Sequence, residues 1–71
     1  MINAKAINHI GIAVKSIDDQ RPFYENVLGA EFEAIEEVPS QKVKVGFFKV
    51  GGVRLELLEP TDPTSSVAGF L

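Results

Sequence analysis

The stretch KVKVGFFKVGGVRLELLE, residues 42–59, decides the fold. It contains two runs rich in β-branched and aromatic residues, which favour strands, separated by a pair of glycines. A glycine pair between two such runs is typical of a two-residue hairpin turn. We therefore expect antiparallel strands over residues 42–50 and 53–59, joined at Gly51 and Gly52.

A two-residue turn also fixes which side chains face each other across the hairpin. One face is apolar, and its expected cross-strand pairs are Val50 with Val53, Phe48 with Leu55, and Gly46 with Leu57. The pairs expected on the other face are Lys49 with Arg54, Phe47 with Glu56, and Val45 with Leu58. Glu56 then stands in the middle of a strand among apolar neighbours, where a carboxylate needs a partner because an unpaired charge is costly.

Another strand is predicted upstream, over residues 6–15 (AINHIGIAVK). Successive side chains of a strand point to opposite faces. The even positions from residue 10 onward are apolar and should face the core. The residues on the second face are His9, Gly11 and Ala13, one polar and two small. His9 is the only histidine of the chain, and the other side chains on its face are small, as in the wall of a cavity.

Residues 17–28 show the apolar spacing of a helix, with Ser16 as its expected N-cap. Pro22 should make the helix irregular or kink it, because proline removes a hydrogen bond and clashes with the preceding turn. Packing this helix on the sheet predicts the core. Its expected members are Ile10, Ile12, Val14, Tyr24, Val27, Leu28, Phe48, Leu55 and Leu57.

The remaining segments complete a strand–helix–strand–strand–strand order, which is an α+β arrangement. Residues 31–38 predict an edge-type strand, although their apolar residues alternate poorly. Residues 61–71 predict the start of a linker helix, capped by Thr64 or Ser65. A chain of 71 residues has room for one small domain, and we expect residues 1–71 to form a single module.

The composition argues against several classes of protein. The sequence contains no cysteine, which excludes a disulfide framework and a thiolate metal site. Its formal net charge is −3 and its basic residues are scattered, which argues against nucleic-acid binding. No apolar run approaches the roughly 20 residues of a membrane span, and the first residues are too polar for a signal peptide. We expect a cytoplasmic protein that binds neither nucleic acid nor membranes.

Two polar residues stand at the centres of otherwise apolar strands, His9 and Glu56. Both are expected on the face away from the helix, and an imidazole nitrogen with a carboxylate oxygen suits a divalent cation. The alternative is that His9 is an ordinary core or surface residue and Glu56 faces solvent on a half-covered sheet. The residues alone leave both interpretations open.

Four basic residues offer a second possible site. Lys42, Lys44, Lys49 and Arg54 lie on the two strands of the hairpin and could together bind an anionic ligand. Lysines on strand edges are, however, also a common protection against aggregation. This alternative therefore remains open too.

Three stretches of the chain together resemble a known family: HIGIAVKSIDD, FYENVLGAE and VKVGFFKVGGVRLELLEPTDPTSSVAGFL. They are similar to the N-terminal half of a vicinal-oxygen-chelate protein of the glyoxalase, bleomycin resistance and dioxygenase superfamily. Within it, the methylmalonyl-CoA epimerases are most similar, and ELLEPT followed by a short helix is the most specific part. The resemblance covers nearly the whole chain.

The resemblance implies a βαβββ module whose curled, mixed four-stranded sheet carries one helix and forms half of a cup. Two modules pack side by side around a divalent metal, and each supplies one ligand from its first strand and one from its fourth. In this sequence those positions are His9 and Glu56. The implied activity is metal-assisted α-proton abstraction from an acyl-CoA thioester, with Co²⁺, Zn²⁺, Mn²⁺ or Ni²⁺ as the ion.

The resemblance also predicts what a single module lacks. The ligands of a second module are missing, and a carboxylate proposed as a base in some family members would fall near Val45, so no catalytic residue is assigned. We therefore expect weak or no turnover, and the alternative is a scaffold that binds a metal or small ligand without catalysis. The first strand should have an unpaired edge, and Val43, Val45, Phe47 and Leu58 should form an uncovered apolar patch. Both features favour a homodimer in which two copies combine their His9 and Glu56.

Overall fold

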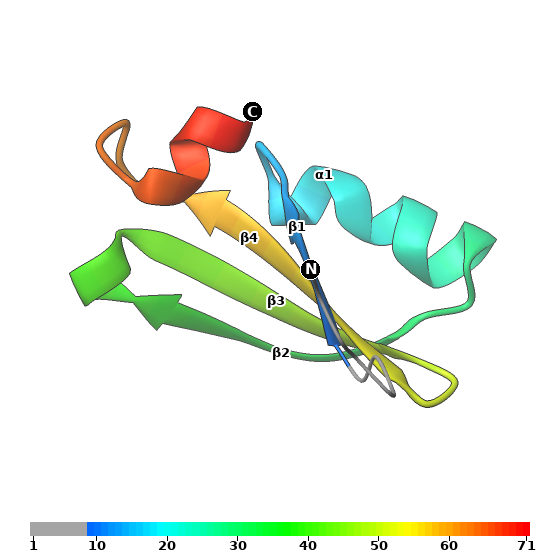
Figure 1. Cartoon of the computed structure of the whole chain (residues 1–71). Coiled ribbons are helices and arrows are strands. Elements are labelled where there is room, and N and C mark those ends of the chain that lie inside the picture. Colours follow the sequence, from blue (N-terminus) through cyan, green and yellow to red (C-terminus); the bar gives the residue numbers. More distant parts are fainter. Residues whose placement is uncertain (1–8) are drawn as a thin grey trace, which may run out of the picture.

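The computed structural model describes residues 9–71 and contains a four-stranded sheet with a helical segment packed on it (Figure 1). The sheet strands are β1 (His9–Ala13), β2 (Glu31–Val38), β3 (Val43–Val50) and β4 (Val53–Pro60). The helical segments are α1 (Ile17–Pro22), η1 (Phe23–Val27), η2 (Pro39–Gln41) and η3 (Ser66–Phe70). The predicted element order and α+β class are confirmed, while residues 6–8 of the first predicted strand lie outside the described residues.

The strand order in the sheet is β1-β4-β3-β2, and the sheet is mixed. β1 runs parallel to β4, whereas the β2–β3 and β3–β4 pairs are antiparallel. The β3–β4 register has all six predicted cross-strand pairs, with Gly51 and Gly52 in the turn. β1 is thus hydrogen-bonded along one side only, which leaves it as an edge strand within the described sheet.

β2 carries a bulge that explains its poor alternation. Phe32 pairs with Phe48, but Ala34 rather than Glu33 pairs with Phe47. An extra residue of this kind shifts the following side chains to the opposite face. After the bulge, Glu36 pairs with Val45 and therefore lies on the face away from the core.

The helical segment is not one α-helix over residues 17–28. Ser16 caps α1 as predicted, because its Oγ accepts a hydrogen bond from the Asp19 amide at 3.2 Å. Directly after Pro22, which cannot donate a backbone hydrogen bond, the helix widens to π geometry over Phe23–Val27. The predicted irregularity at Pro22 is confirmed, and the wider turns rotate the following side chains away from the positions that a 3.6-residue period assigns to them.

The core lies between α1 and the sheet. Its buried members are Val14, Ile17, Ala30, Phe48, Leu55 and Leu57, and Ile12 and Tyr24 pack against them. Three predicted members are wrong, namely Ile10, Val27 and Leu28, which are 43%, 67% and 46% exposed. Val27 is the last residue of the π segment and Leu28 comes directly after it, and Ile10 lies on a strand whose outer side is unpaired within the described sheet. On β3, Gly46 permits close packing, since a Cβ there would lie 3.0 Å from Ile17 Cγ2.

The chain after β4 returns to the start of β3. The Thr61 amide donates to the Lys42 carbonyl at 2.8 Å, and Ser65 Oγ donates to the Gln41 carbonyl at 3.1 Å. Ser65 also caps η3, which contacts β4 and β1, so the alternative with Ser65 as the cap is confirmed. No helix within residues 9–71 has both the length and the apolar character that a membrane crossing requires.

The predicted uncovered apolar patch is only partly present. Val43 and Val45 are buried, at 2% and 7% exposure, although neither belongs to the core cluster beneath α1. Phe47 and Leu58 are half-buried. The prediction of four uncovered residues is therefore wrong for the two valines, which lie at the end of β3 nearest the returning C-terminal segment.

Candidate metal site and its surroundings

The register of β1 and β4 decides where the two candidate ligands lie. Gly11 is the Cα partner of Glu56, and His9 is the Cα partner of Arg54. Paired residues of neighbouring strands point to the same face of a sheet, and residues two apart on one strand share a face. The backbone positions of His9 and Glu56 are therefore on the same face, in adjacent strands and two residues out of register.

Glu56 is half-buried and lies opposite Phe47 on β3. Among the side chains that the structure describes, none donates a hydrogen bond to its carboxylate or forms an ion pair with it. A partly buried carboxylate without such a partner is well suited to bind a cation. The donor chemistry at this position thus fits a divalent ion, with the carboxylate as one ligand.

The donor set is incomplete within the described part of the chain. No group of three or more His, Cys, Asp or Glu side chains is placed to hold a metal ion among those residues. Divalent transition metals in proteins are usually bound by three or four protein ligands. His9 and Glu56 would supply two of these ligands.

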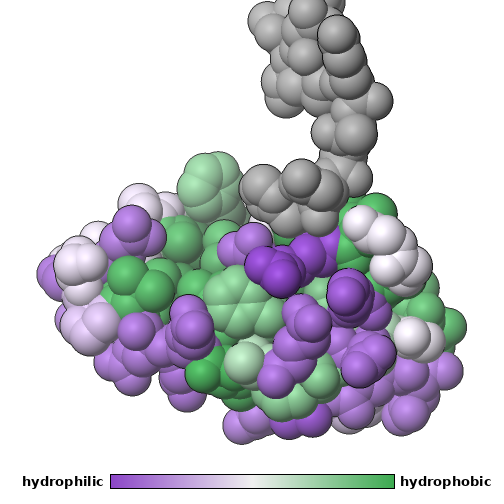
Figure 2. All heavy atoms as spheres, turned by 90° about the horizontal axis from the view of Figure 1, so that it is seen from below, coloured by the Kyte–Doolittle hydropathy of each residue, from purple (hydrophilic) through white to green (hydrophobic). Residues whose placement is uncertain are grey.

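The face opposite α1 also carries an open pocket of about 210 Å³. Its lining residues are Glu33, Ala34, Glu36, Phe47 and Arg54, from β2, β3 and β4. Figure 2 views the molecule from below and shows apolar side chains near the middle of the surface, with hydrophilic ones around and between them. Alternation from Phe32 already places Glu33 on this face, although the sequence analysis did not single it out. The bulge brings Glu36 to the same face, and it has no clear signature in the sequence.

The four basic residues considered from the sequence do not form one cluster. Lys42 Nζ donates to Thr64 Oγ1 at 2.6 Å, and Lys44 Nζ lies 3.8 Å from Glu59 Oε2. Arg54 is the one of the four that lines the open pocket. The prediction that all four bind one anion together is therefore not supported by their placement.

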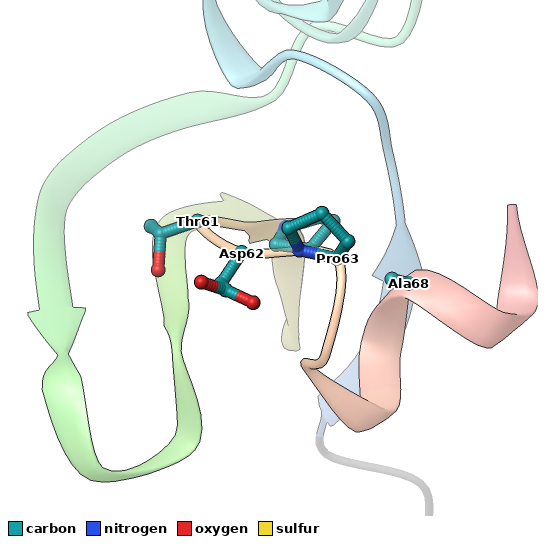
Figure 3. A pocket seen from close by; sticks show the side chains of 5 residues that line it. Thr61, Asp62, Pro63 and Ala68 are labelled. Atoms are coloured by element: carbon teal, nitrogen blue, oxygen red, sulfur yellow. The ribbon is translucent and has the colours of Figure 1, made fainter.

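A second hollow, of about 280 Å³, lies beside the loop that follows β4. Figure 3 shows Thr61, Asp62 and Pro63 on this loop and Ala68 on η3 nearby. Asp62 accepts hydrogen bonds from the Thr64 amide at 2.8 Å and the Thr64 hydroxyl at 2.7 Å. Both bonds favour the ionised carboxylate and lower the pKa of Asp62 below its usual value. These contacts account for Asp62 as a residue that stabilises the turn.

Comparison with known proteins identifies relatives over almost the whole chain. Residues 8–69 match the Glyoxalase/Bleomycin resistance protein/Dioxygenase superfamily. The uncharacterised protein YqjC of Bacillus subtilis is 57% identical over 65 residues, which is 92% of this chain and 46% of YqjC. The mitochondrial methylmalonyl-CoA epimerase of Bos taurus is 41% identical over 69 residues, which is 97% of this chain and 39% of that protein.

Solved structures agree with this assignment. A hypothetical protein of Bacillus halodurans C-125 superposes with a TM-score of 0.86 at 45% identity, over 92% of this chain and 47% of that one. A variant of Streptomyces coelicolor methylmalonyl-CoA epimerase, in complex with 2-nitronate-propionyl-CoA, has a TM-score of 0.81 at 35% identity, with 92% and 51% of the chains covered. The chain thus spans about half the length of the relatives it matches.

Proposed function

Because the chain belongs to the glyoxalase/bleomycin resistance protein/dioxygenase superfamily, we propose that it is the metal-binding half of a methylmalonyl-CoA epimerase-like enzyme. The observation that carries the proposal is the β1–β4 register, which sets the positions of His9 and Glu56 on one face of the sheet. Relatives named as methylmalonyl-CoA epimerases, at 35–41% identity, support an acyl-CoA thioester as the substrate.

In this proposal an imidazole nitrogen of His9 and the carboxylate of Glu56 bind one divalent ion. This pair of donors suits Co²⁺, Zn²⁺, Mn²⁺ or Ni²⁺ better than Ca²⁺, which prefers oxygen ligands only. A bound ion would supply a Lewis acid that polarises the thioester carbonyl. Glu56 serves as a ligand here and is not proposed as the base.

Epimerisation also requires proton transfer on both sides of the α-carbon, and hence two acid or base groups. The family resemblance leads one to look for a carboxylate on β3 near Val45, and Val45 itself is apolar and buried. We therefore propose that the module on its own has weak or no turnover, and that a second module completes the site. Residues 61–71 are proposed as the beginning of a linker.

For this chain the proposed second module is another copy. The outer side of β1 is not paired within the described sheet, and such an edge is a template for association. A two-fold dimer would contribute two His9 and two Glu56 to one site. It would bind about one divalent ion per two chains.

The reaction is tested by following exchange of the α-proton of methylmalonyl-CoA in D₂O by NMR, with and without Co²⁺. We expect slow, metal-dependent exchange that His9→Ala and Glu56→Gln abolish. Glu37→Gln is the matched control, because Glu37 lies on β2 in register with Lys44, on the other face of the sheet. Exchange that persists at the wild-type rate in His9→Ala would contradict the proposed site.

The second candidate function is a scaffold that binds a metal or small ligand without turnover. The half-buried carboxylate of Glu56, which has no paired donor or cation among the described side chains, would support metal binding with or without turnover. Stoichiometric metal binding that depends on His9 and Glu56, combined with no α-proton exchange at any Co²⁺ concentration, would support the scaffold over a module with residual epimerase turnover.

A further inference from the structure

We propose that Arg54 and the pocket beside Phe47 form a subsite for an oxyanion, occupied by the free carboxylate of a malonyl-type acyl thioester. The inference rests on the proposed function, because it adds a determinant of substrate choice to the same face of the sheet. It concerns how the thioester is recognised, and Arg54 binds the substrate in it without taking part in proton transfer.

The first supporting observation is the position of Arg54 on β4. Arg54 is two residues from Glu56 on the same strand and is the Cα partner of His9 on β1. Residues two apart on a strand share a face and are separated by about 7 Å. Arg54 therefore stands beside the proposed metal ligands, on the face that carries the pocket of about 210 Å³.

The second supporting observation is the surroundings of the Arg54 guanidinium group. Arg54 Nε lies 3.7 Å from Glu33 Oε1, and its Cζ lies 5.9 Å from the centre of the Phe47 ring. Among the described side chains, none accepts a hydrogen bond at the terminal amino groups of Arg54, and the side chain is 54% exposed. Glu33 thus lies beside the Nε side of the guanidinium and leaves its terminal amino groups open, and these groups can bind a carboxylate through two hydrogen bonds.

The bulge in β2 lies beside this contact and adds a second carboxylate to the pocket. Glu33 has no Cα partner on β3, because its neighbours Phe32 and Ala34 pair with Phe48 and Phe47. The bulge also turns Glu36 to the pocket side. Bulges often re-aim side chains next to functional sites. Glu33 is accordingly a positioning residue for Arg54, whereas Glu36 repels an anion in the pocket and keeps its affinity moderate.

The distance between the two groups favours the acyl carboxylate over the phosphates of coenzyme A. In a malonyl-type thioester the free carboxylate and the thioester carbonyl are bonded to the same carbon. A ligand whose carbonyl lies near Glu56 therefore presents its carboxylate within reach of Arg54, two residues along β4. The phosphates of coenzyme A are separated from the thioester by the whole pantetheine arm.

The test compares two thioesters that differ only in this carboxylate. Dissociation constants of methylmalonyl-CoA and propionyl-CoA are measured by calorimetry in the presence of Co²⁺, for the unmodified chain and for Arg54→Gln. The unmodified chain should bind methylmalonyl-CoA about three- to tenfold more tightly, and Arg54→Gln should abolish this preference without weakening propionyl-CoA. Arg54→Lys keeps the positive charge but loses the paired donors of the guanidinium, so it should retain part of the preference for methylmalonyl-CoA.

Lys49→Gln provides the matched control. It removes the same charge from the residue that pairs with Arg54 across the hairpin, but Lys49 does not line the pocket, so the preference should survive. Glu36→Gln should strengthen methylmalonyl-CoA binding. Amide NMR spectra establish that each variant is folded before its affinity is compared.

Three results would overturn the inference. If the unmodified chain binds the two thioesters equally, Arg54 does not select the carboxylate, while the proposed function stands. If Arg54→Gln weakens both thioesters and free coenzyme A to the same extent, the anion at Arg54 is a phosphate. If the unmodified chain binds neither thioester, the proposed function fails together with the subsite.

Discussion

Glu59 at the end of β4 and Ile17 at the start of α1 are 42 residues apart and are joined by a hydrogen bond. The Ile17 amide donates to Glu59 Oε1 at 2.7 Å, and Glu59 Oε2 lies 3.8 Å from Lys44 Nζ. The first amides of a helix have no partner within the helix, and a carboxylate there also complements the helix dipole. The contact holds α1 against the strand that carries Glu56.

Replacing Glu59 should therefore loosen α1. We expect Glu59→Ala to lower the free energy of unfolding by about 1–2 kcal/mol, because a helical amide loses its acceptor. Glu59→Gln should cost less, since the amide oxygen still accepts. Urea denaturation followed by circular dichroism measures both. Glu37→Ala, an exposed carboxylate on β2, is the control, with a change within about 0.5 kcal/mol. An equal loss in Glu59→Ala and the control would show that the contact contributes nothing.

Two leucines that the sequence placed together in the core should respond differently to truncation. Leu57 is 0% exposed and belongs to the core cluster, whereas Leu28 is 46% exposed after the π segment. We expect Leu57→Ala to cost about 2–5 kcal/mol, enough to unfold a small domain, and Leu28→Ala to cost less than about 1 kcal/mol. Thermal denaturation of the two variants provides the comparison. Similar losses would mean that Leu28 is packed as tightly as Leu57.

The hairpin register could be predicted because one local feature determines it. Gly51 and Gly52 allow a two-residue turn, and alternation then assigns every side chain of β3 and β4 to a face. The burial of the helical segment could not be predicted as well. The directions of its side chains change where the helix passes from α to π geometry after Pro22. The π turns do not follow the 3.6-residue period from which core positions are predicted.

For the candidate site, the sequence predicted the face of Glu56 but not its neighbours. Alternation suffices for Glu56, because β4 is regular and its pairing with β3 was known from the turn. The face of Glu36 depends instead on a bulge that forms only when β2 pairs with β3. A bulge is a property of the pairing, so no inspection of residues 31–38 alone identifies it.

The turn after β4 gives a prediction for pH dependence. Hydrogen bonds from Thr64 lower the pKa of Asp62 below its usual value, so the ionised form is favoured in the folded state. The resulting stabilisation is present above the unfolded pKa of about 3.8 and is lost as the pH falls through the lower folded pKa. Thr64→Val removes the hydroxyl donor and should raise the pKa of Asp62 toward the usual value.

An NMR titration of the Asp62 side-chain carboxyl in both proteins measures this shift. Asp18→Asn is a suitable control variant, because Asp18 lies in the first turn of α1 and has no part in this turn. A pKa of Asp62 that is identical in the unmodified chain and in Thr64→Val would show that the amide of Thr64 alone sets it.

The central claim is that His9 and Glu56 bind one divalent ion from the same face of the sheet, and a Co²⁺ titration tests it most directly. Calorimetry and the visible absorption of bound Co²⁺ give the affinity and the stoichiometry, and sedimentation equilibrium gives the mass of the assembly. We expect about one ion per two chains, with affinity lowered by at least about tenfold in both His9→Ala and Glu56→Ala and unchanged in Glu37→Gln. Co²⁺ affinity that is the same in the unmodified chain, His9→Ala and Glu56→Ala would contradict the claim.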